Sequence, residues 1–146
     1  MHAYYFCDME STHAQAIETS QARVQRTSDA LVEIYFKADA TLDAAGIGEV
    51  IAAKRALCTD GEPDVLAVVD DAMEVDLRVV NIDHHTLHGV CGNARRLAFV
   101  TGDELNAKLA EIHFRYFPRN FETNVFRNEE DARRWLAPKA PQPSLS

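Results

Sequence analysis

A change in hydrophobic pattern along the chain constrains its fold most. Residues 22–27 and 31–36 alternate apolar and polar side chains, as half-buried strands do, and Ser28-Asp29 between them can form a tight turn. Residues 65–69 and 97–100 are instead short, unbroken apolar runs, which are typical of strands covered on both faces in a parallel sheet. The chain is therefore predicted to begin with a β-hairpin and to continue with buried strands.

The segments between these strands have helical spacing. Residues 43–58 place apolar side chains on one face, and Asp43 can accept backbone N–H bonds at the helix start. This face consists of Ile47, Val50, Ile51, Leu57 and Cys58. Residues 76–89 have a weaker pattern, for which we also expect a helix.

A third helix is predicted over residues 103–117, and Pro118 stops it. Its apolar side chains recur three or four positions apart, which predicts a stripe buried against the sheet. The stripe consists of Leu105, Leu109, Ile112 and Tyr116.

The last predicted elements are an alternating strand over residues 121–126 and a helix that Asn128 can cap. We expect Trp135 to be buried against the sheet, with Phe126 near it. The inward face consists of Ala132, Trp135 and Leu136. The ion pairs expected on the outer face are Glu129 with Arg133 and Glu130 with Arg134.

The predicted order is β-β-α-β-α-β-α-β-α. Strands that alternate with helices indicate the α/β fold class: a β-hairpin, then alternating α and β elements, in a mostly parallel sheet with flanking helices. We divide the chain into an N-terminal arm (1–19), one α/β domain (20–136) and a Pro/Ser-rich tail (137–146) expected to be disordered.

Composition excludes several functional classes. The formal charge of −8 opposes binding to nucleic acid or to an anionic membrane surface. The stretch HFRYFPRNF interleaves aromatic and basic residues as nucleic-acid platforms do, but it spans a helix end and a strand start. Three cysteines without a CxxC pair fit reduced thiols. No apolar run approaches ~20 residues, and the start lacks the pattern of a secretory signal. We expect a cytoplasmic protein without nucleic-acid or membrane partners.

Between residues 17 and 136 the chain contains the stretches IETSQARVQRT, LVEIYFKADATLD, IAAKRAL, VLAVVD, ARRLAFVTGDELNAKLAEIHFRYF and FETNVFRNEEDARRWL. These stretches resemble a group of small bacterial proteins with STAS-like domains, which share the fold of the SpoIIAA-like anti-sigma-factor antagonists. The resemblance implies a mostly parallel sheet and a role in protein–protein regulation. The best-known relatives carry a phosphorylatable Ser after the third strand, whereas DDAMEVD at residues 70–76 here contains neither Ser nor Thr.

That acidic stretch follows a buried strand, and a threonine ends the next strand. The possible ligand or partner edge consists of Asp70, Asp71, Glu74, Asp76 and Thr101. Open α/β sheets bind ligands at the carboxyl ends of their strands, where these residues should lie. A phosphoacceptor site would also need a Lys, which the last strand does not supply, so a hydrated acidic loop is the simpler interpretation. We predict no catalytic residue.

The stretch IDHHTLHGVC, at residues 82–91, raises the question of a metal site. His84 and His88 would share a helix face, and Cys91 would lie one turn further. However, Gly89 interrupts the helix before Cys91, and the activating Glu of a zinc-protease motif is missing. We therefore predict no metal and no cofactor, with the histidines as polar residues on a helix facing solvent.

These observations favour a non-enzymatic STAS-like interaction domain in bacterial regulation, working as a homodimer. For the dimer, we expect strand 22–27 to be the free edge of the sheet, where another copy could pair. One alternative is a metal-dependent enzyme or sensor that uses His84, His88 and Cys91. Another is a carrier of a small apolar ligand, because lipid-binding domains of the CRAL-TRIO type share a related fold. An enclosed apolar cavity would favour the carrier.

Overall fold

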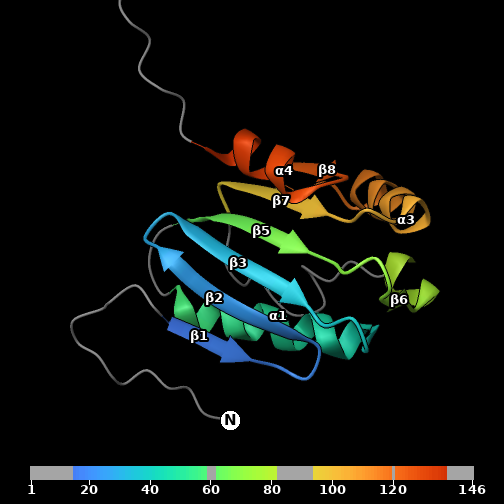
Figure 1. Ribbon diagram of the computed structural model, residues 1–146, viewed down its shortest axis with the longest axis horizontal. Helices are drawn as coiled ribbons and strands as arrows, with labels where there is room; N and C mark the ends of the chain where they lie inside the picture. Colours follow the sequence, from blue (N-terminus) through green and yellow to red (C-terminus); the bar gives the residue numbers. More distant parts are fainter. Residues whose placement is uncertain (1–14, 59–61, 82–93, 120, 138–146) are drawn as a thin grey trace, which may run out of the picture.

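A six-stranded mixed sheet organises the domain (Figure 1). The computed structural model describes residues 15–58, 62–81, 94–119 and 121–137. The strands lie in the order β1 (Gln15–Glu18), β2 (Ala22–Ser28), β3 (Leu31–Phe36), β5 (Asp64–Val68), β7 (Arg96–Val100) and β8 (Glu122–Phe126). The first three are antiparallel, and β3, β5, β7 and β8 run parallel. The predicted α/β class, with its hairpin and mostly parallel sheet, is confirmed.

The α-helices in the described part of the chain each begin directly after a capping residue. They are α1 (Ala44–Leu57), α3 (Glu104–Tyr116) and α4 (Glu129–Leu136). Each begins after a residue whose side-chain oxygen accepts the N–H three positions on: Asp43, Asp103 and Asn128, at 2.8 to 2.9 Å. Such caps satisfy backbone donors that a helix leaves open at its first turn. The caps predicted at Asp43 and Asn128 are confirmed.

A second, two-stranded sheet lies beyond the carboxyl ends of the main strands. It pairs β4 (Thr41–Leu42) with β6 (Glu74–Val75) in parallel. A 3-10 helix, η1 (Leu77–Asn81), follows it. The helix predicted over residues 76–89 is thus wrong in its first part, where the backbone N–H of Asp76 donates to Leu42 of β4 and residues 77–81 form a 3-10 helix. The remainder, from residue 82, lies outside the described residues.

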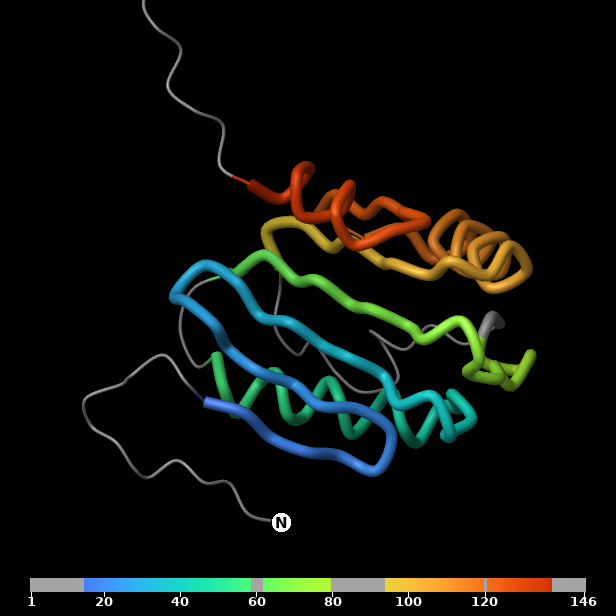
Figure 2. Tube along the Cα trace, viewed as in Figure 1, coloured from blue at the N-terminus to red at the C-terminus, as the bar shows by residue number. Residues whose placement is uncertain are grey.

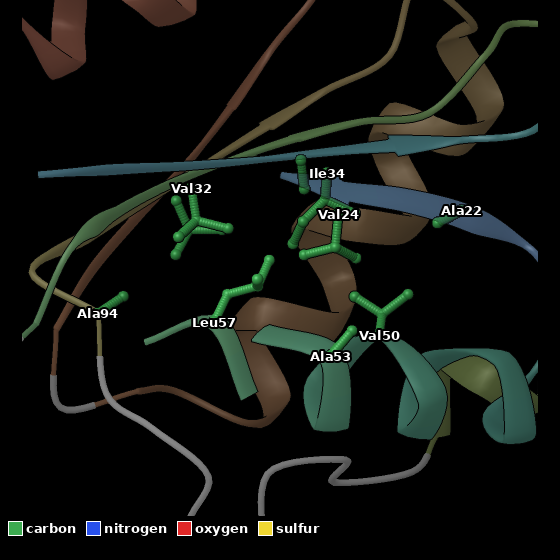
Figure 3. Close-up of a cluster of buried hydrophobic side chains, with 10 residues drawn as sticks. Ala22, Val24, Val32, Ile34, Val50, Ala53, Leu57 and Ala94 are labelled. Carbon is green, nitrogen blue, oxygen red and sulfur yellow. The ribbon is translucent and has the colours of Figure 1, made fainter. Parts of the chain in front are cut away.

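The chain order of the strands decides which face the helices cover. Strands β3, β5, β7 and β8 follow one another across the sheet, so the right-handed crossovers that contain α1 and α3 pass over the same face. On this face α1 packs Val50 and Ala53 against Val24 of β2 (Figure 3). Phe114 of α3 meets Phe99 of β7 edge-on, with ring centroids 6.2 Å apart. Both helices therefore lie on the same face of the sheet.

The opposite face is closed by α4, which packs over β5, β7 and β8. Its core consists of Leu66, Ala98, Val100, Ala132 and Leu136. Trp135 is only partly buried, and its ring centroid lies 5.5 Å from that of Phe126. The guanidinium of Arg96 lies over the same ring and donates to the carbonyls of Trp135 and Leu136. The predicted neighbour is correct, and Arg96 covers part of the indole.

The N-terminal strand corrects two expectations. Gln15–Glu18, which we assigned to the arm, form β1 and pair with β2, as the tube in Figure 2 also shows. The segment at residues 22–27 is consequently an inner strand, and the outer strands of the main sheet are β1 and β8. Four residues with only two apolar side chains give too short an alternation to be recognised in sequence. Residues 1–14 and the tail at 138–146 lie outside the described residues.

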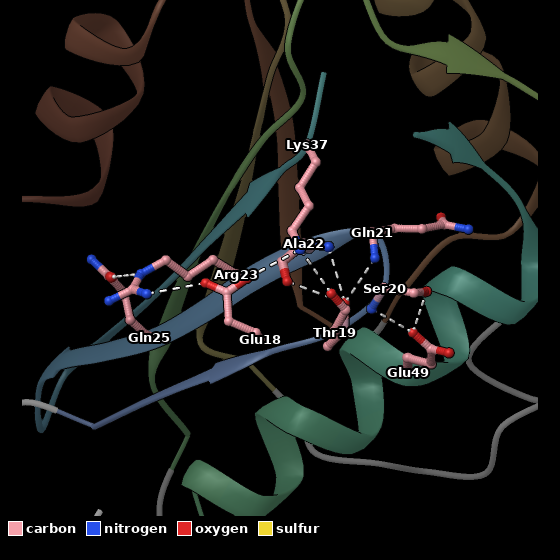
Figure 4. Close-up of polar contacts among 9 residues, drawn as sticks. All are labelled: Glu18, Thr19, Ser20, Gln21, Ala22, Arg23, Gln25, Lys37 and Glu49. Atoms are coloured by element: carbon pink, nitrogen blue, oxygen red, sulfur yellow. Dashed lines mark hydrogen bonds and ion pairs between the residues drawn. The ribbon is translucent and has the colours of Figure 1, made fainter. Parts of the chain in front are cut away.

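Polar contacts hold the end of β1 in place (Figure 4). The backbone N–H and hydroxyl of Ser20 both donate to Glu49 of α1, at 3.0 and 2.6 Å. Lys37 forms an ion pair with Glu18 at 3.1 Å. Burial raises the pKa of Glu18, but the hydrogen bonds from Lys37 and Arg23 outweigh it and hold that pKa below its ordinary value. The segment at residues 15–20 is thus part of the folded domain.

The orientation of α3 differs most from the prediction. Of the stripe expected to be buried, Leu105 is 64% exposed, Ile112 39% and Tyr116 71%. The residues that α3 buries are smaller: Asn106, Ala107 and Ala110. At the end of the sheet α3 packs mainly on β8 and η1, and small side chains let the helix approach closely. Leu105, Ile112 and Tyr116 therefore face outward, whereas Leu109 of the predicted stripe is partly buried.

Candidate functional site

The acidic turn after β5 is connected to the end of β7. Asp71 accepts a hydrogen bond from the backbone N–H of Gly102 at 2.8 Å. A Cβ added at Gly102 would lie 2.7 Å from the Asp71 carboxylate, so only glycine permits this approach. Asp70 accepts from the N–H of Ala72 within the turn, at 2.9 Å. Both carboxylates thus hold backbone in place at the carboxyl end of the sheet.

Thr101 lies beside this connection and is completely buried. Its hydroxyl accepts from the N–H of Asp103 at 3.3 Å, and its own N–H donates to the carbonyl of Phe126 at 3.0 Å. A hydroxyl without solvent contact orders the start of α3 and cannot itself meet a partner. Asp71 and Thr101 therefore lie at the same end of the sheet, and each holds neighbouring backbone in place.

Glu74 lies in the second sheet, and Asp76 directly follows its strand β6. Glu74 is exposed in β6, while the backbone N–H of Asp76 donates to the carbonyl of Leu42. The Asp76 carboxylate receives the backbone N–H of Arg78 and two bonds from its guanidinium, which hold the pKa of Asp76 below its usual range. The five predicted edge residues thus divide between two sheets that meet at one edge.

These carboxylates do not converge on a metal. Throughout the described part of the chain, no group of three or more His, Cys, Asp or Glu side chains is placed to hold an ion. His84, His88 and Cys91, the alternative metal ligands, lie outside the described residues. No described helix is long and apolar enough to cross a lipid bilayer.

Exposed apolar side chains adjoin the acidic edge. We define the α3 ridge as Leu77 of η1 with Leu105, Ile112 and Tyr116 of α3. Leu77 is 63% exposed, and η1 packs against α3. The bond between Asp71 and Gly102 fixes the start of α3 next to the acidic turn, so the ridge begins where the edge ends. Clustered exposed apolar side chains of this size are a common mark of interaction sites.

A third feature is an apolar pocket of about 230 Å³. It lies between α1 and α3, over the inner face of β3, β5 and β7. Its wall on these strands consists of Ile34, Phe36, Val65, Ala67, Leu97 and Phe99. Four polar side chains also line it: Lys54, Asn106, His113 and Arg119. Among the described lining residues there is no carboxylate.

The amino-acid sequence identifies the family to which the chain belongs. The pattern that defines SpoIIAA-like proteins matches residues 11–137 of the chain. The chain belongs to the SpoIIAA-like family. No match was found among curated proteins or among solved structures. The family match confirms the resemblance and its fold, and it indicates a STAS-type regulatory or interaction domain.

In this SpoIIAA-like domain, the turn at residues 70–76 occupies the place where the resemblance puts the relatives' phosphorylatable Ser. Here the carboxylates of Asp70 and Asp71 accept backbone N–H bonds instead. From the sequence we predicted a ligand or partner site at this edge, which stays a prediction, and we did not predict the α3 ridge or the pocket. A usable pattern existed for the ridge, because Ala107 and Ala110 mark a second, small-residue face on the same helix. For the pocket the sequence offers no local pattern, since its walls come from distant segments.

Proposed function

We propose that this SpoIIAA-like chain is a non-enzymatic regulatory domain of the bacterial cytoplasm that binds a partner protein at the carboxyl ends of its sheet. The α3 ridge carries the proposal. Leu105, Ile112 and Tyr116 lie on one helix face and remain exposed in the described chain. A monomeric domain gains nothing from exposing this area, whereas a partner would bury it.

The charges beside the ridge define the chemistry of the partner. Exposed acids surround its start: Asp70, Asp71, Glu74 and Glu104. At the acidic edge itself the cations Arg78 and Arg127 are engaged, with Asp76 and with the carbonyl of Gly102, while the exposed cations of α3, Lys108 and Arg115, lie further along the helix. A segment that offers apolar side chains flanked by Lys or Arg would complement this surface. Such charges mainly accelerate association and select partners, while the apolar contacts supply affinity.

Site-specific crosslinking in cells tests the surface. A photo-crosslinking amino acid at Tyr116 should capture a defined protein, whereas the same group at Ala52, exposed on the outer side of α1, should not. Adding Leu105→Lys should abolish the Tyr116 product without lowering thermal stability, because Leu105 is largely exposed. Equal products from Tyr116 and Ala52, or a Tyr116 product that survives Leu105→Lys, would contradict the proposal.

We propose further that the chain forms a homodimer through β1. Within the described residues no strand pairs with the outer side of β1, so its backbone donors and acceptors face away from the sheet. Antiparallel pairing of two copies would give a two-fold symmetric dimer and cover both edges. Light scattering at high micromolar concentration should give twice the mass of one chain. The mass of a single chain at that concentration would refute the dimer.

A further inference from the structure

The two outer strands of the main sheet, β1 and β8, each have one side on which no described strand pairs. An open edge can accept a strand from another chain. A chain that paired through both edges would build an open-ended assembly, whereas pairing through one edge alone closes a dimer. The backbone contacts of the two edges differ, and this difference decides which edge is available.

On β8 an outward-facing donor is already bonded. The carbonyl of Phe126 accepts the N–H of Thr101, so the backbone of Phe126 faces β7. Successive residues of a strand direct their backbone groups to opposite sides, so the N–H of Val125 faces away from the sheet. The side-chain oxygen of Asn124 accepts this N–H at 2.9 Å. A strand arriving at β8 would have to displace a hydrogen bond that the chain makes with itself.

On β1 the outward-facing groups remain available. The N–H of Thr19 donates to the carbonyl of Ala22 at 2.8 Å, so the backbone of Thr19 faces β2. By the same alternation the backbone of Ile17 also faces β2. Ala16 and Glu18 therefore direct their N–H and C=O groups outward, where no described strand pairs with them.

These outward groups restrict how two copies of β1 can pair about a two-fold axis. In the register centred on Ile17, Ala16 of each copy exchanges both backbone bonds with Glu18 of the other, which uses every outward group of the strand. In the register centred on Ala16, only Ala16 finds a partner within the strand. In the register centred on Glu18, two carboxylates face each other, and like charges directly opposite destabilise a sheet.

The side chains also fit the register centred on Ile17. Ile17 packs against the core cluster beneath α1, so two copies of Ile17 would extend that core across the axis. On the opposite face Glu18 would meet Ala16, which is small. The Glu18 carboxylate is already paired within its own chain, with Lys37 and with Arg23, each at 3.1 Å (Figure 4). Neither face therefore places unpaired like charges opposite each other.

We infer that two copies join through β1 alone, in the antiparallel register centred on Ile17, while Asn124 keeps β8 closed to further strands. The inference rests on the homodimer proposed above and specifies its interface. Two six-stranded sheets become one continuous sheet, with β8 at both ends.

Single cysteines report the register. The parent for this test carries Cys7→Ser, Cys58→Ala and Cys91→Ser. Ile17→Cys should form a disulfide with the second copy on mild oxidation, because opposite residues that exchange no backbone bonds have Cα atoms about 4.5 Å apart. Ala16→Cys is the matched control, since its two copies would lie diagonally, about 7–8 Å apart and too far for a disulfide. A non-reducing gel should show twice the mass of one chain for Ile17→Cys only.

Backbone variants separate the two edges. Ala16→Pro removes an outward N–H, which an edge strand tolerates, so light scattering should give the mass of one chain while circular dichroism keeps the folded signal. Asn124→Val frees the N–H of Val125 and should add species larger than the dimer. Glu122→Val is the control on the same strand, because Glu122 is exposed and does not accept that N–H, and it should remain a dimer.

The possible failures are distinguishable. A linked dimer from Ala16→Cys or Glu18→Cys, or none from folded Ile17→Cys, would overturn the register even if the parent is a dimer. An unchanged mass for Asn124→Val would show that Asn124 does not protect β8. A parent with the mass of one chain, or a dimer that survives Ala16→Pro, would instead remove the proposed β1 homodimer. Crosslinking from Tyr116 should be unchanged in Ala16→Pro, because the partner surface lies on α3.

Discussion

Replacing Arg133 by Met should destabilise the domain by about 2–3 kcal/mol. Glu33 lies in the central part of the sheet with its side chain only 8% exposed, and Arg133 reaches its carboxylate at 2.8 Å. The same guanidinium donates to the Tyr35 hydroxyl at 2.9 Å and pairs with Glu129 at 2.8 Å. Without Arg133, the buried carboxylate keeps only Gln25 and Tyr35, at 3.0 and 3.4 Å.

The magnitude follows from the burial of the two partners. Losing a hydrogen bond to a charged group costs about 1.5–3 kcal/mol, and breaking a fully buried ion pair costs about 3–5 kcal/mol. The Arg133 side chain is 41% exposed, so water can reach part of the site and the lower range applies. For a domain of this size, the melting temperature should fall by roughly 5–10 °C.

Urea denaturation followed by far-ultraviolet circular dichroism would measure the loss. Arg134→Met is the matched control, because Arg134 is 68% exposed and pairs with the exposed Glu130 and Asp131. Its effect should stay within about 0.5 kcal/mol. Adding Glu33→Gln to Arg133→Met should recover part of the stability, since no charge then remains buried. Equal losses in the two Met variants, or no recovery in the double variant, would refute the reasoning.

Three further predictions concern side chains elsewhere. Trp135→Ala should cost about 2–4 kcal/mol in urea, below the full range for a buried Trp, and a fully solvent-exposed Trp emission in the parent protein would contradict this. Burial, with the charge of Glu33, raises the pKa of Tyr35 to about 12. Because this folded pKa exceeds the unfolded value of about 10, the neutral phenol contributes stability below pH ~10 that is lost as pH rises through about 12, and Tyr35→Phe should remove that decline. Protein purified without a histidine tag should hold far less than one zinc per chain; near-stoichiometric zinc, lost in both His84→Ala and His88→Ala, would reverse our view of that stretch.

Much of the fold could be predicted because its determinants are local. The alternation in β2 and β3, the apolar runs of β5 and β7, and the caps Asp43 and Asn128 all act within a few residues of the structure they produce. The ion pair of Arg133 with Glu129 was predicted for the same reason. Its contact with Glu33 was not, because the two residues are 100 positions apart and no periodicity links them.

The errors have a common physical origin. A hydrophobic period of 3.6 shows that a helix has a distinct face, but not whether a sheet or a partner covers that face. In α3 the sheet is approached by Ala107 and Ala110, while Leu105 and Tyr116 remain outside. Likewise, strand order predicted that Asp70 and Asp71 follow a buried strand at its carboxyl end. It could not predict that the Asp71 carboxylate accepts a backbone N–H, because this depends on the close approach of Gly102.

The strand order of the main sheet also has a consequence for synthesis on the ribosome. From β1 to β8 each new strand pairs with the one made just before it, and none must be inserted later between existing neighbours. A growing chain therefore exposes one advancing edge, which limits the time available for misassembly. The apolar surface of β5 and β7, with Leu66 and Ala98, stays uncovered longest, because α4 covers it and is made after all six strands. Translation products that stop before residue 128 would keep this surface uncovered and should be the species that aggregate or are degraded.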